Sequence, residues 1–147
     1  MSEAGPRAIQ LTVPSDPGCL TVVRAMVEKM SRLGGFGDGD VERIVMAVDE
    51  ALANIICHQY GGRCDERIDV AARWGLEEQG VEFVLRDYGP QCDPSVLRDC
   101  LGGKLRPGGL GVHVIKDVMD TVEYTAAPGG GMQLRLAKSV AADNRKG

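Results

Sequence analysis

The sequence lacks several features that would assign it to a broad functional class. Its 147 residues carry a net charge of −4, so the chain has no overall positive charge for binding nucleic acid. No apolar run is long enough to span a bilayer, and residues 1–7 lack the basic-then-apolar order of a signal peptide. These absences predict one cytoplasmic globular domain over residues 1–147, with its core at about 8–138 and with neither nucleic acid nor a membrane as partner.

Familiar motifs are missing as well. The five cysteines are odd in number and irregularly spaced, which argues against a disulfide framework. We expect small buried or half-buried thiols; zinc is the alternative, disfavoured because its candidate ligands lack the spacing of a structural site. Those candidates are Cys57, His58, Cys64 and His113. There is no G-x-x-x-x-G-K-[ST] phosphate loop, and no G-x-G-x-x-G follows the first predicted strand.

Apolar periodicity predicts strands and helices in a definite order. The expected strands are 9–13, 68–74, 81–87, 121–126 and 132–138; the expected helices are 17–33, 38–60, 94–101 and 110–119. Consecutive strands joined by short turns pair antiparallel, and a helix with a single apolar stripe covers one face of a sheet. The sequence therefore predicts an α+β fold, a two-layer sandwich whose mixed, mainly antiparallel sheet carries its helices on one face.

A polar ridge runs along the helix predicted at 38–60. Glu50, Asn54 and His58 follow one another at four-residue steps, on the side away from the apolar stripe. A solvated helix face is one interpretation of this pattern. In the functional interpretation, the amide oxygen of Asn54 holds Mg²⁺ and the carboxylate of Glu50 orients or deprotonates a nucleophile.

Asp87 continues the apolar alternation of Val81, Phe83 and Leu85, so the pattern places a carboxylate on the buried face at the end of a strand. Such a group needs hydrogen-bond donors, because burying it without them is costly. A backbone N–H of the following turn is one candidate donor, and the exocyclic amino group of adenine is another. Gly89 lacks a Cβ and would permit a flat ring to approach closely.

Residues 102–111 are rich in glycine and lead directly into the helix predicted at 110–119. Glycine loops expose N–H groups, and a helix N-terminus favours anions. Lys104 and Arg106 add positive charge, so the segment predicts a phosphate cradle; a flexible connection is the alternative. Residues 88–109 as a whole have the length of a lid or binding loop.

Three segments together resemble the motifs of the GHKL (Bergerat-fold) ATPases, and among these the stand-alone anti-sigma-factor serine kinases of bacterial partner switching. Residues 50–60 (EALANIICHQY) match the asparagine box of that family. Residues 85–90 (LRDYGP) match its first glycine box, and residues 108–111 (GGLG) match its second. The resemblance extends from about residue 9 to residue 138.

The resemblance implies ATP and Mg²⁺ as cofactors, and a serine or threonine of a STAS-type antagonist protein as the phosphate acceptor. Glu50 is then the catalytic base, Asn54 the ligand of Mg²⁺ beside the nucleotide, and Asp87 the partner of the adenine amino group. The other nucleotide-binding residues that it implies are Gly89, Arg106, Gly108, Gly109, Leu110 and Gly111. A sigma factor as a further partner and a homodimer are also expected from the family.

Two positions depart from the family pattern. Gln91 stands where a second glycine is usual, which predicts restricted lid motion. Met132 stands where a threonine usually assists the adenine-binding carboxylate, so that contact is expected to be absent or supplied by another group.

The competing function is an ATP-binding module that sequesters a partner without phosphorylating it. Glu50 favours catalysis, because a pure binder needs no base. Arg24 and Lys29 of the first helix could meet an acidic partner, although a solvated face is the favoured explanation.

Overall fold

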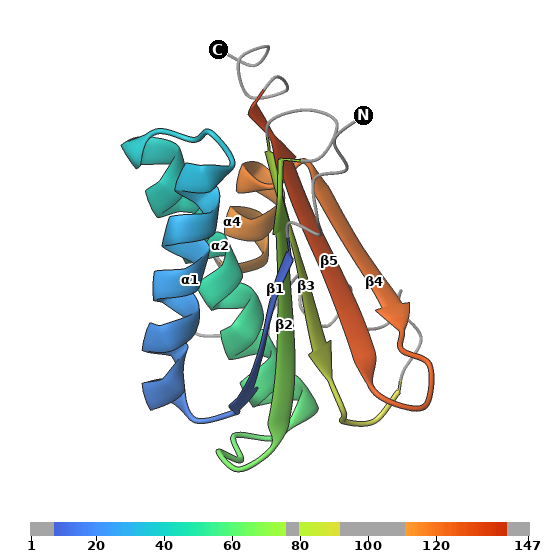
Figure 1. Cartoon of the computed structure of the whole chain (residues 1–147). Coiled ribbons are helices and arrows are strands. Elements are labelled where there is room, and N and C mark those ends of the chain that lie inside the picture. The colour runs from blue at the N-terminus through green and yellow to red at the C-terminus, as the bar shows by residue number, and fades with distance from the viewer. Residues whose placement is uncertain (1–7, 76–79, 92–110, 141–147) are drawn as a thin grey trace.

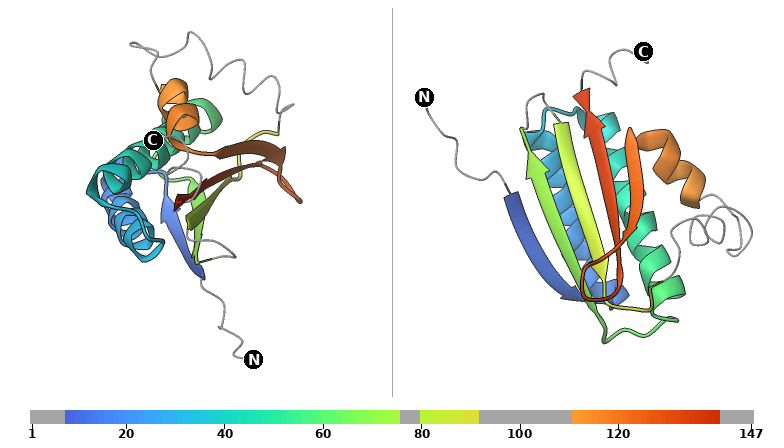
Figure 2. Two further views of the ribbon diagram at one scale, coloured as in Figure 1. Left: turned by 90° about the horizontal axis from the view of Figure 1, so that it is seen from above. Right: turned by 90° about the vertical axis from the view of Figure 1, so that its right-hand side faces the viewer.

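The computed structural model describes residues 8–75, 80–91 and 111–140 of the chain (Figure 1). Within these ranges, five strands form one sheet, and the α-helices pack on one of its faces (Figure 2). In chain order the elements are β1 (Ala8–Pro14), a 3₁₀ turn (Pro17–Cys19), α1 (Leu20–Leu33), α2 (Asp38–Asn54), a π-helical turn (Ile55–Gln59), β2 (Arg67–Trp74), β3 (Gly80–Asp87), α4 (Gly111–Val118), β4 (Thr121–Ala126) and β5 (Met132–Ser139).

The strand order in the sheet is β1-β2-β3-β5-β4. All four pairings of these strands are antiparallel, which confirms the two-layer α+β sandwich and replaces the expected mixed sheet with an antiparallel one. β3 is the central strand, and its last residue, Asp87, pairs with Ile68 of β2. Two residues earlier, Leu85 pairs with Leu134 of β5. The carboxyl end of β3 therefore lies between two neighbouring strands.

The helix predicted at 17–33 is present as a 3₁₀ turn followed by α1. Asp16 accepts a hydrogen bond from the Gly18 N–H at 2.9 Å, and Pro17 begins the 3₁₀ turn that leads into the helix. The helix ends at Leu33, before Gly34. Its buried apolar side chains form one stripe: Leu20, Val23, Val27 and Met30. No helix in the described ranges is long and apolar enough to cross a membrane.

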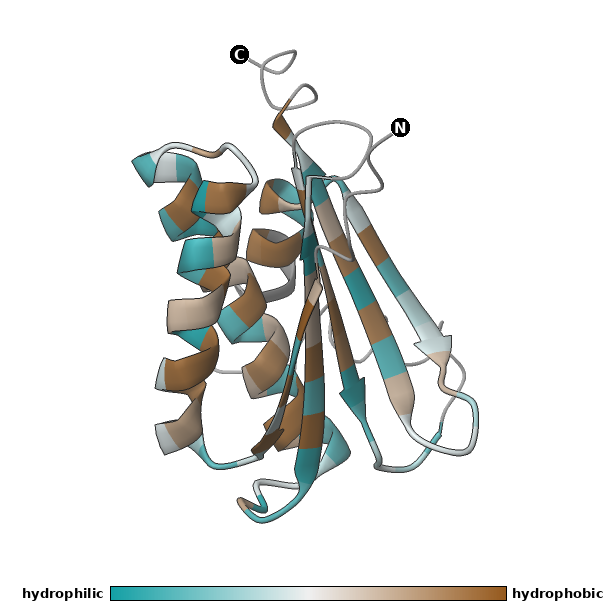
Figure 3. Ribbon diagram, in the orientation of Figure 1, coloured by the Kyte–Doolittle hydropathy of each residue, from teal (hydrophilic) through white to brown (hydrophobic). Residues whose placement is uncertain are grey.

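The two faces of the sheet differ in polarity, as the alternating colours along β5 show (Figure 3). Side chains such as Phe83 and Leu136 point toward the helices and are fully buried. On the opposite face, Glu82 accepts a hydrogen bond from Arg135 Nε at 2.7 Å and lies 3.6 Å from Arg73 Nη1. Because the helices bury only one face, the apolar core lies between the two layers.

Lys138 is an exception on the core-facing side of β5. Only 7% of its surface is exposed, and its Nζ donates a hydrogen bond to the Val118 carbonyl at 2.9 Å. Val118 is the last residue of α4, where a cation stabilises the exposed carbonyl groups of a helix end. This contact fastens the end of α4 to the sheet.

The cysteines follow the prediction only in part. Cys19 is half-buried, as expected, but Cys57 and Cys64 are exposed, so that prediction is wrong for these two. Both lie in the segment between α2 and β2, where their side chains face solvent and not the core. Cys92 and Cys100 lie outside the described residues. Among the described residues, no three His, Cys, Asp or Glu side chains are grouped so that they could hold a metal ion.

Candidate functional site

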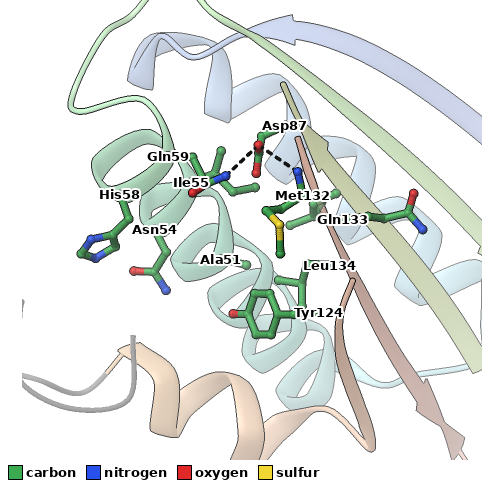
Figure 4. Close-up of a pocket in the computed structure, with 11 residues that line it drawn as sticks. Ala51, Asn54, Ile55, His58, Gln59, Asp87, Tyr124, Met132, Gln133 and Leu134 are labelled. Atoms are coloured by element: carbon green, nitrogen blue, oxygen red, sulfur yellow. Dashed lines mark hydrogen bonds between the residues drawn. The ribbon is translucent and has the colours of Figure 1, made fainter. Parts of the chain in front are cut away.

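A pocket opens between the end of α2 and the sheet (Figure 4). One wall comes from α2 and the π-helical turn, and the other comes from the ends of β3, β4 and β5. Its lining residues are Ala51, Asn54, Ile55, His58, Gln59, Leu85, Asp87, Tyr124, Met132, Gln133 and Leu134. The fold thus brings Asn54 and Asp87, predicted from separate motifs, to the same pocket.

Asp87 is the most enclosed charged group of the pocket, with 2% of its surface exposed. Its Oδ1 accepts three hydrogen bonds: from Gln59 Nε2 at 3.0 Å, from the Gly89 N–H at 2.9 Å and from the Met132 N–H at 3.2 Å. The predicted donor in the following turn is therefore confirmed as Gly89, and two further donors were not predicted. In the described part of the chain, all three donors bond to Oδ1. The other oxygen, Oδ2, therefore stays available as a hydrogen-bond acceptor on the pocket wall.

Two glycines let the chain close tightly around Asp87. A Cβ on Gly131 would stand 1.9 Å from the Asp87 carbonyl oxygen, and its φ of +80° also disfavours any other residue. A Cβ on Gly89 would stand 2.9 Å from the Gln59 carbonyl oxygen. The close approach seen at Gly89 is thus to the π-helical turn, and the approach of a flat ring to this glycine stays a prediction.

The end of α2 departs from regular α-helix where it meets the pocket. The Tyr60 N–H bonds to the Ile55 carbonyl at 3.2 Å, across five residues, and this wider turn spans 55–59. π turns of this kind are frequent at functional sites. Because the turn holds an extra residue, both His58 and Gln59 reach the pocket.

The polar ridge on α2 is not a solvated face at Asn54. That side chain is buried, with 3% of the residue exposed. The interpretation of a solvated ridge is therefore wrong there. Glu50 is half-buried one turn earlier and does not line the pocket formed by the described residues.

Both departures from the family pattern have a structural counterpart. Where a threonine was expected to assist Asp87, the backbone N–H of Met132 and the side-chain amide of Gln59 donate instead. The amide of Gln91 donates to the Ala127 carbonyl at 2.6 Å and so fastens residue 91 to the β4–β5 connection. This bond is consistent with restricted lid motion, which stays a prediction.

Several predicted site residues lie outside the described residues. These are Arg106, Gly108, Gly109 and Leu110, together with the helix expected at 94–101. Gly111 is described as the first residue of α4. The phosphate cradle therefore stays a prediction, of which the structure describes only the helix that follows it.

Other pocket residues were not predicted. Tyr124 of β4 lines the pocket, and burial raises its pKa to about 12. Gln59 stands one residue beyond the four-residue ridge, so helical periodicity points it elsewhere, and only a predicted π turn would have found it. Arg24, considered as a contact for an acidic partner, pairs within the chain with Asp49 at 2.8 Å.

The comparison with family models identifies the class of protein. Residues 13–138 match the model described as the histidine kinase-like ATPase domain. Among curated proteins, the serine-protein kinase RsbW of Halalkalibacterium halodurans is 32% identical over 126 residues, which are 80% of this chain and 75% of that protein. The serine-protein kinase RsbW of Bacillus pumilus is 28% identical over 129 residues, or 82% of this chain and 80% of that one. The chain therefore belongs to the histidine kinase-like ATPase domain family and, within it, to the group that contains the serine-protein kinases RsbW.

Solved structures agree with the fold. The SiaB–SiaC complex from Pseudomonas aeruginosa contains a chain that superposes with a TM-score of 0.68 at 12% identity, covering 90% of both chains. The RsbU and RsbW domains of a Mycobacterium tuberculosis protein give a TM-score of 0.62 at 18% identity, covering 90% of this chain and 32% of that one. At these identities the likeness concerns the fold alone.

Proposed function

We propose that the chain is an ATP-dependent protein serine/threonine kinase that acts as an anti-sigma factor or partner-switching regulator and phosphorylates a STAS-type antagonist protein. The observation that carries the proposal is the buried Asp87, whose Oδ1 is saturated by three donors while Oδ2 keeps acceptor capacity at the pocket. A carboxylate arranged in this way suits the exocyclic amino group of adenine. The names of the relatives at 32% and 28% identity support the kinase assignment.

Asn54 suits a magnesium site beside the phosphates. Its side-chain amide reaches the pocket wall, and an amide oxygen is a ligand that hard cations accept. Mg²⁺ commonly takes only one or two protein ligands and completes its shell with substrate phosphates and water, so a single amide would suffice. When bound there, the ion would neutralise phosphate charge during transfer.

Glu50 is the proposed base, one helical turn before Asn54. Its carboxylate accepts the proton of the acceptor hydroxyl while that oxygen forms a bond to the γ-phosphorus of ATP. The bond between this phosphorus and the β–γ bridging oxygen breaks, and ADP leaves. Positioning of the two reactants and neutralisation of charge supply most of the rate in such transfers.

The alternative function is an ATP-binding module that holds a partner without phosphorylating it. One observation favours it: Glu50 does not line the pocket formed by the described residues. A sigma factor as a second partner and a homodimer belong to the main proposal as family expectations, and the cytoplasmic location belongs to it as an expectation from the sequence. All three go beyond what the pocket itself supports.

Phosphate transfer from γ-labelled ATP with Mg²⁺ tests the proposal, with the STAS-domain protein encoded nearest to this chain as acceptor. We expect transfer by the wild type. Glu50→Ala should retain ATP binding and lower the transfer rate by about 10²–10⁴-fold, the usual contribution of a general base. Asp87→Asn should lose ATP binding itself.

Matched controls come from exposed carboxylates of the same residue types. Glu42→Ala on α2 and Asp117→Asn on α4 should behave as the wild type, because both side chains face solvent. ATP binding that depends on Asp87, without transfer to any STAS protein, would support the binding module. No ATP binding by the wild type would overturn both functions.

A further inference from the structure

We propose that Gln59 is a positioning residue for base recognition. Its side-chain amide holds the carboxylate of Asp87 in one orientation, in which Oδ2 accepts a hydrogen bond from an exocyclic amino group of the bound purine. This inference rests on the proposed nucleotide function and concerns the base specificity of the same pocket. Gln59 has no role among the motif residues implied by the sequence, and the π-helical turn alone brings it to Asp87.

The amide of Gln59 has a single orientation that satisfies its neighbours. Its Nε2 lies 3.0 Å from Asp87 Oδ1 and 3.0 Å from the Pro90 carbonyl oxygen. Both neighbours are acceptors, so only the nitrogen end of the amide can face them, and both of its N–H groups are used. The side chain therefore clamps the carboxylate from the helix side (Figure 4).

The other two donors to Asp87 are backbone groups on the strand side, at Gly89 and Met132. Gln59 is thus the one side chain among the described residues that donates a hydrogen bond to this carboxylate. All three bonds converge on Oδ1, which orients the carboxylate plane and keeps Oδ2 as the acceptor for a ligand. A hydrogen bond between a neutral donor and an ionised acceptor is stronger than one between neutral groups, so removing this donor should loosen the orientation measurably.

Losing Gln59 should affect the recognition of one group of the ligand, the exocyclic amino group of the purine. Adenine presents an amino donor to an acceptor at this position, whereas hypoxanthine presents a carbonyl oxygen that an ionised carboxylate repels. If Gln59 sets the orientation of Asp87, its loss should weaken the nucleotide with the amino group more than the one without it. If Gln59 only stabilises the surrounding turn, its loss should weaken both nucleotides equally.

Equilibrium titration of the full chain with ATP and with inosine triphosphate tests the proposal. Gln59→Met preserves the length of the side chain and removes the donor. We expect its preference for ATP over inosine triphosphate to be about tenfold lower than that of the wild type, as for one lost hydrogen bond to a charged group. Gln59→Glu should lower the preference further, because it places a second carboxylate beside Asp87.

Gln91→Met is the matched control. Its amide also bonds a backbone carbonyl, that of Ala127, but does not contact Asp87. It should keep the wild-type preference. An equal loss of both nucleotides, or an unchanged preference, in Gln59→Met and Gln59→Glu would overturn the inference while leaving the kinase proposal intact. A wild type that binds neither nucleotide would overturn the proposed function, and this inference with it.

Discussion

The hydroxyl of Tyr60 accepts a hydrogen bond from the backbone N–H of Tyr88 at 2.6 Å. The same hydroxyl donates to the Arg67 carbonyl, and only 1% of Tyr60 is exposed. Burial raises the pKa of this phenol, which keeps it neutral and able to donate. Tyr60 follows the π-helical turn and Tyr88 follows Asp87, so one buried side chain ties together the two halves of the candidate site.

Removing this hydroxyl should weaken both the fold and the site. Tyr60→Phe leaves the Tyr88 N–H and the Arg67 carbonyl without their partner in a closed environment. We expect the free energy of unfolding to fall by about 1–3 kcal/mol, measured by urea denaturation. ATP affinity should fall as well, because the backbone beside Asp87 loses its anchor. Tyr124→Phe is the control: its hydroxyl bonds no other described residue, so equal destabilisation by both changes would contradict the role of Tyr60.

Gly131 and Gly129 give a matched pair for the tight turn over Asp87. Both have a left-handed backbone, with φ of +80° and +86°, but a Cβ would meet the Asp87 carbonyl only at Gly131. Gly129→Ala should cost about 1–2 kcal/mol, the strain of that backbone region alone. Gly131→Ala should cost about 1–3 kcal/mol more from overpacking, and it should also reduce ATP affinity, because the clash displaces Asp87. Equal stabilities and equal affinities of the two variants would show that the close approach does not constrain the site.

The fold could be predicted because its elements carry simple apolar patterns. Alternating residues in β2 and β3 and the stripe of α1 determine which face each element buries, and short turns determine antiparallel pairing. The same alternation placed Asp87 on the buried face, correctly. The π-helical turn could not be predicted in this way, because its residues 55–59 continue an apolar helical pattern without any residue that marks a wider turn.

The residues of the candidate site that belong to sequence motifs could be predicted, but their hydrogen-bond partners could not. Asn54 and Asp87 line one pocket, as the resemblance implied, but the donors to Asp87 come from three separate segments. Gln59 and Met132 act through tertiary contacts that local sequence patterns do not encode. The burial of Asn54 was not evident either, because the helical pattern places this residue on the polar ridge.

A second cluster lies on the outer face of the sheet, next to Tyr88. The ring of Tyr88 is covered by the guanidinium groups of Arg67 and Arg86, whose central carbon atoms lie 4.8 Å and 4.5 Å from its centroid. Asp69 accepts hydrogen bonds from the Tyr88 hydroxyl, from Arg67 Nε at 3.0 Å and from Thr12 Oγ1 at 2.8 Å. The cluster therefore connects β1 and β2 to the residue that follows Asp87.

Acid should release the stabilisation that Asp69 provides. Burial raises the pKa of Asp69, but the hydrogen bonds from Tyr88, Arg67 and Thr12 together lower it by more. The pKa of Asp69 therefore lies below the ordinary value of 3.8. A carboxyl with a depressed folded pKa stabilises the protein fully above its unfolded pKa and loses that contribution as the pH falls through the folded pKa. Asp69→Asn should therefore be less stable than the wild type at pH 7, and the difference should shrink below about pH 4, near the unfolded pKa. Urea denaturation across this range measures it, with exposed Asp65→Asn as a control that should show little difference at any pH; a constant gap for Asp69→Asn would contradict the assigned hydrogen bonds.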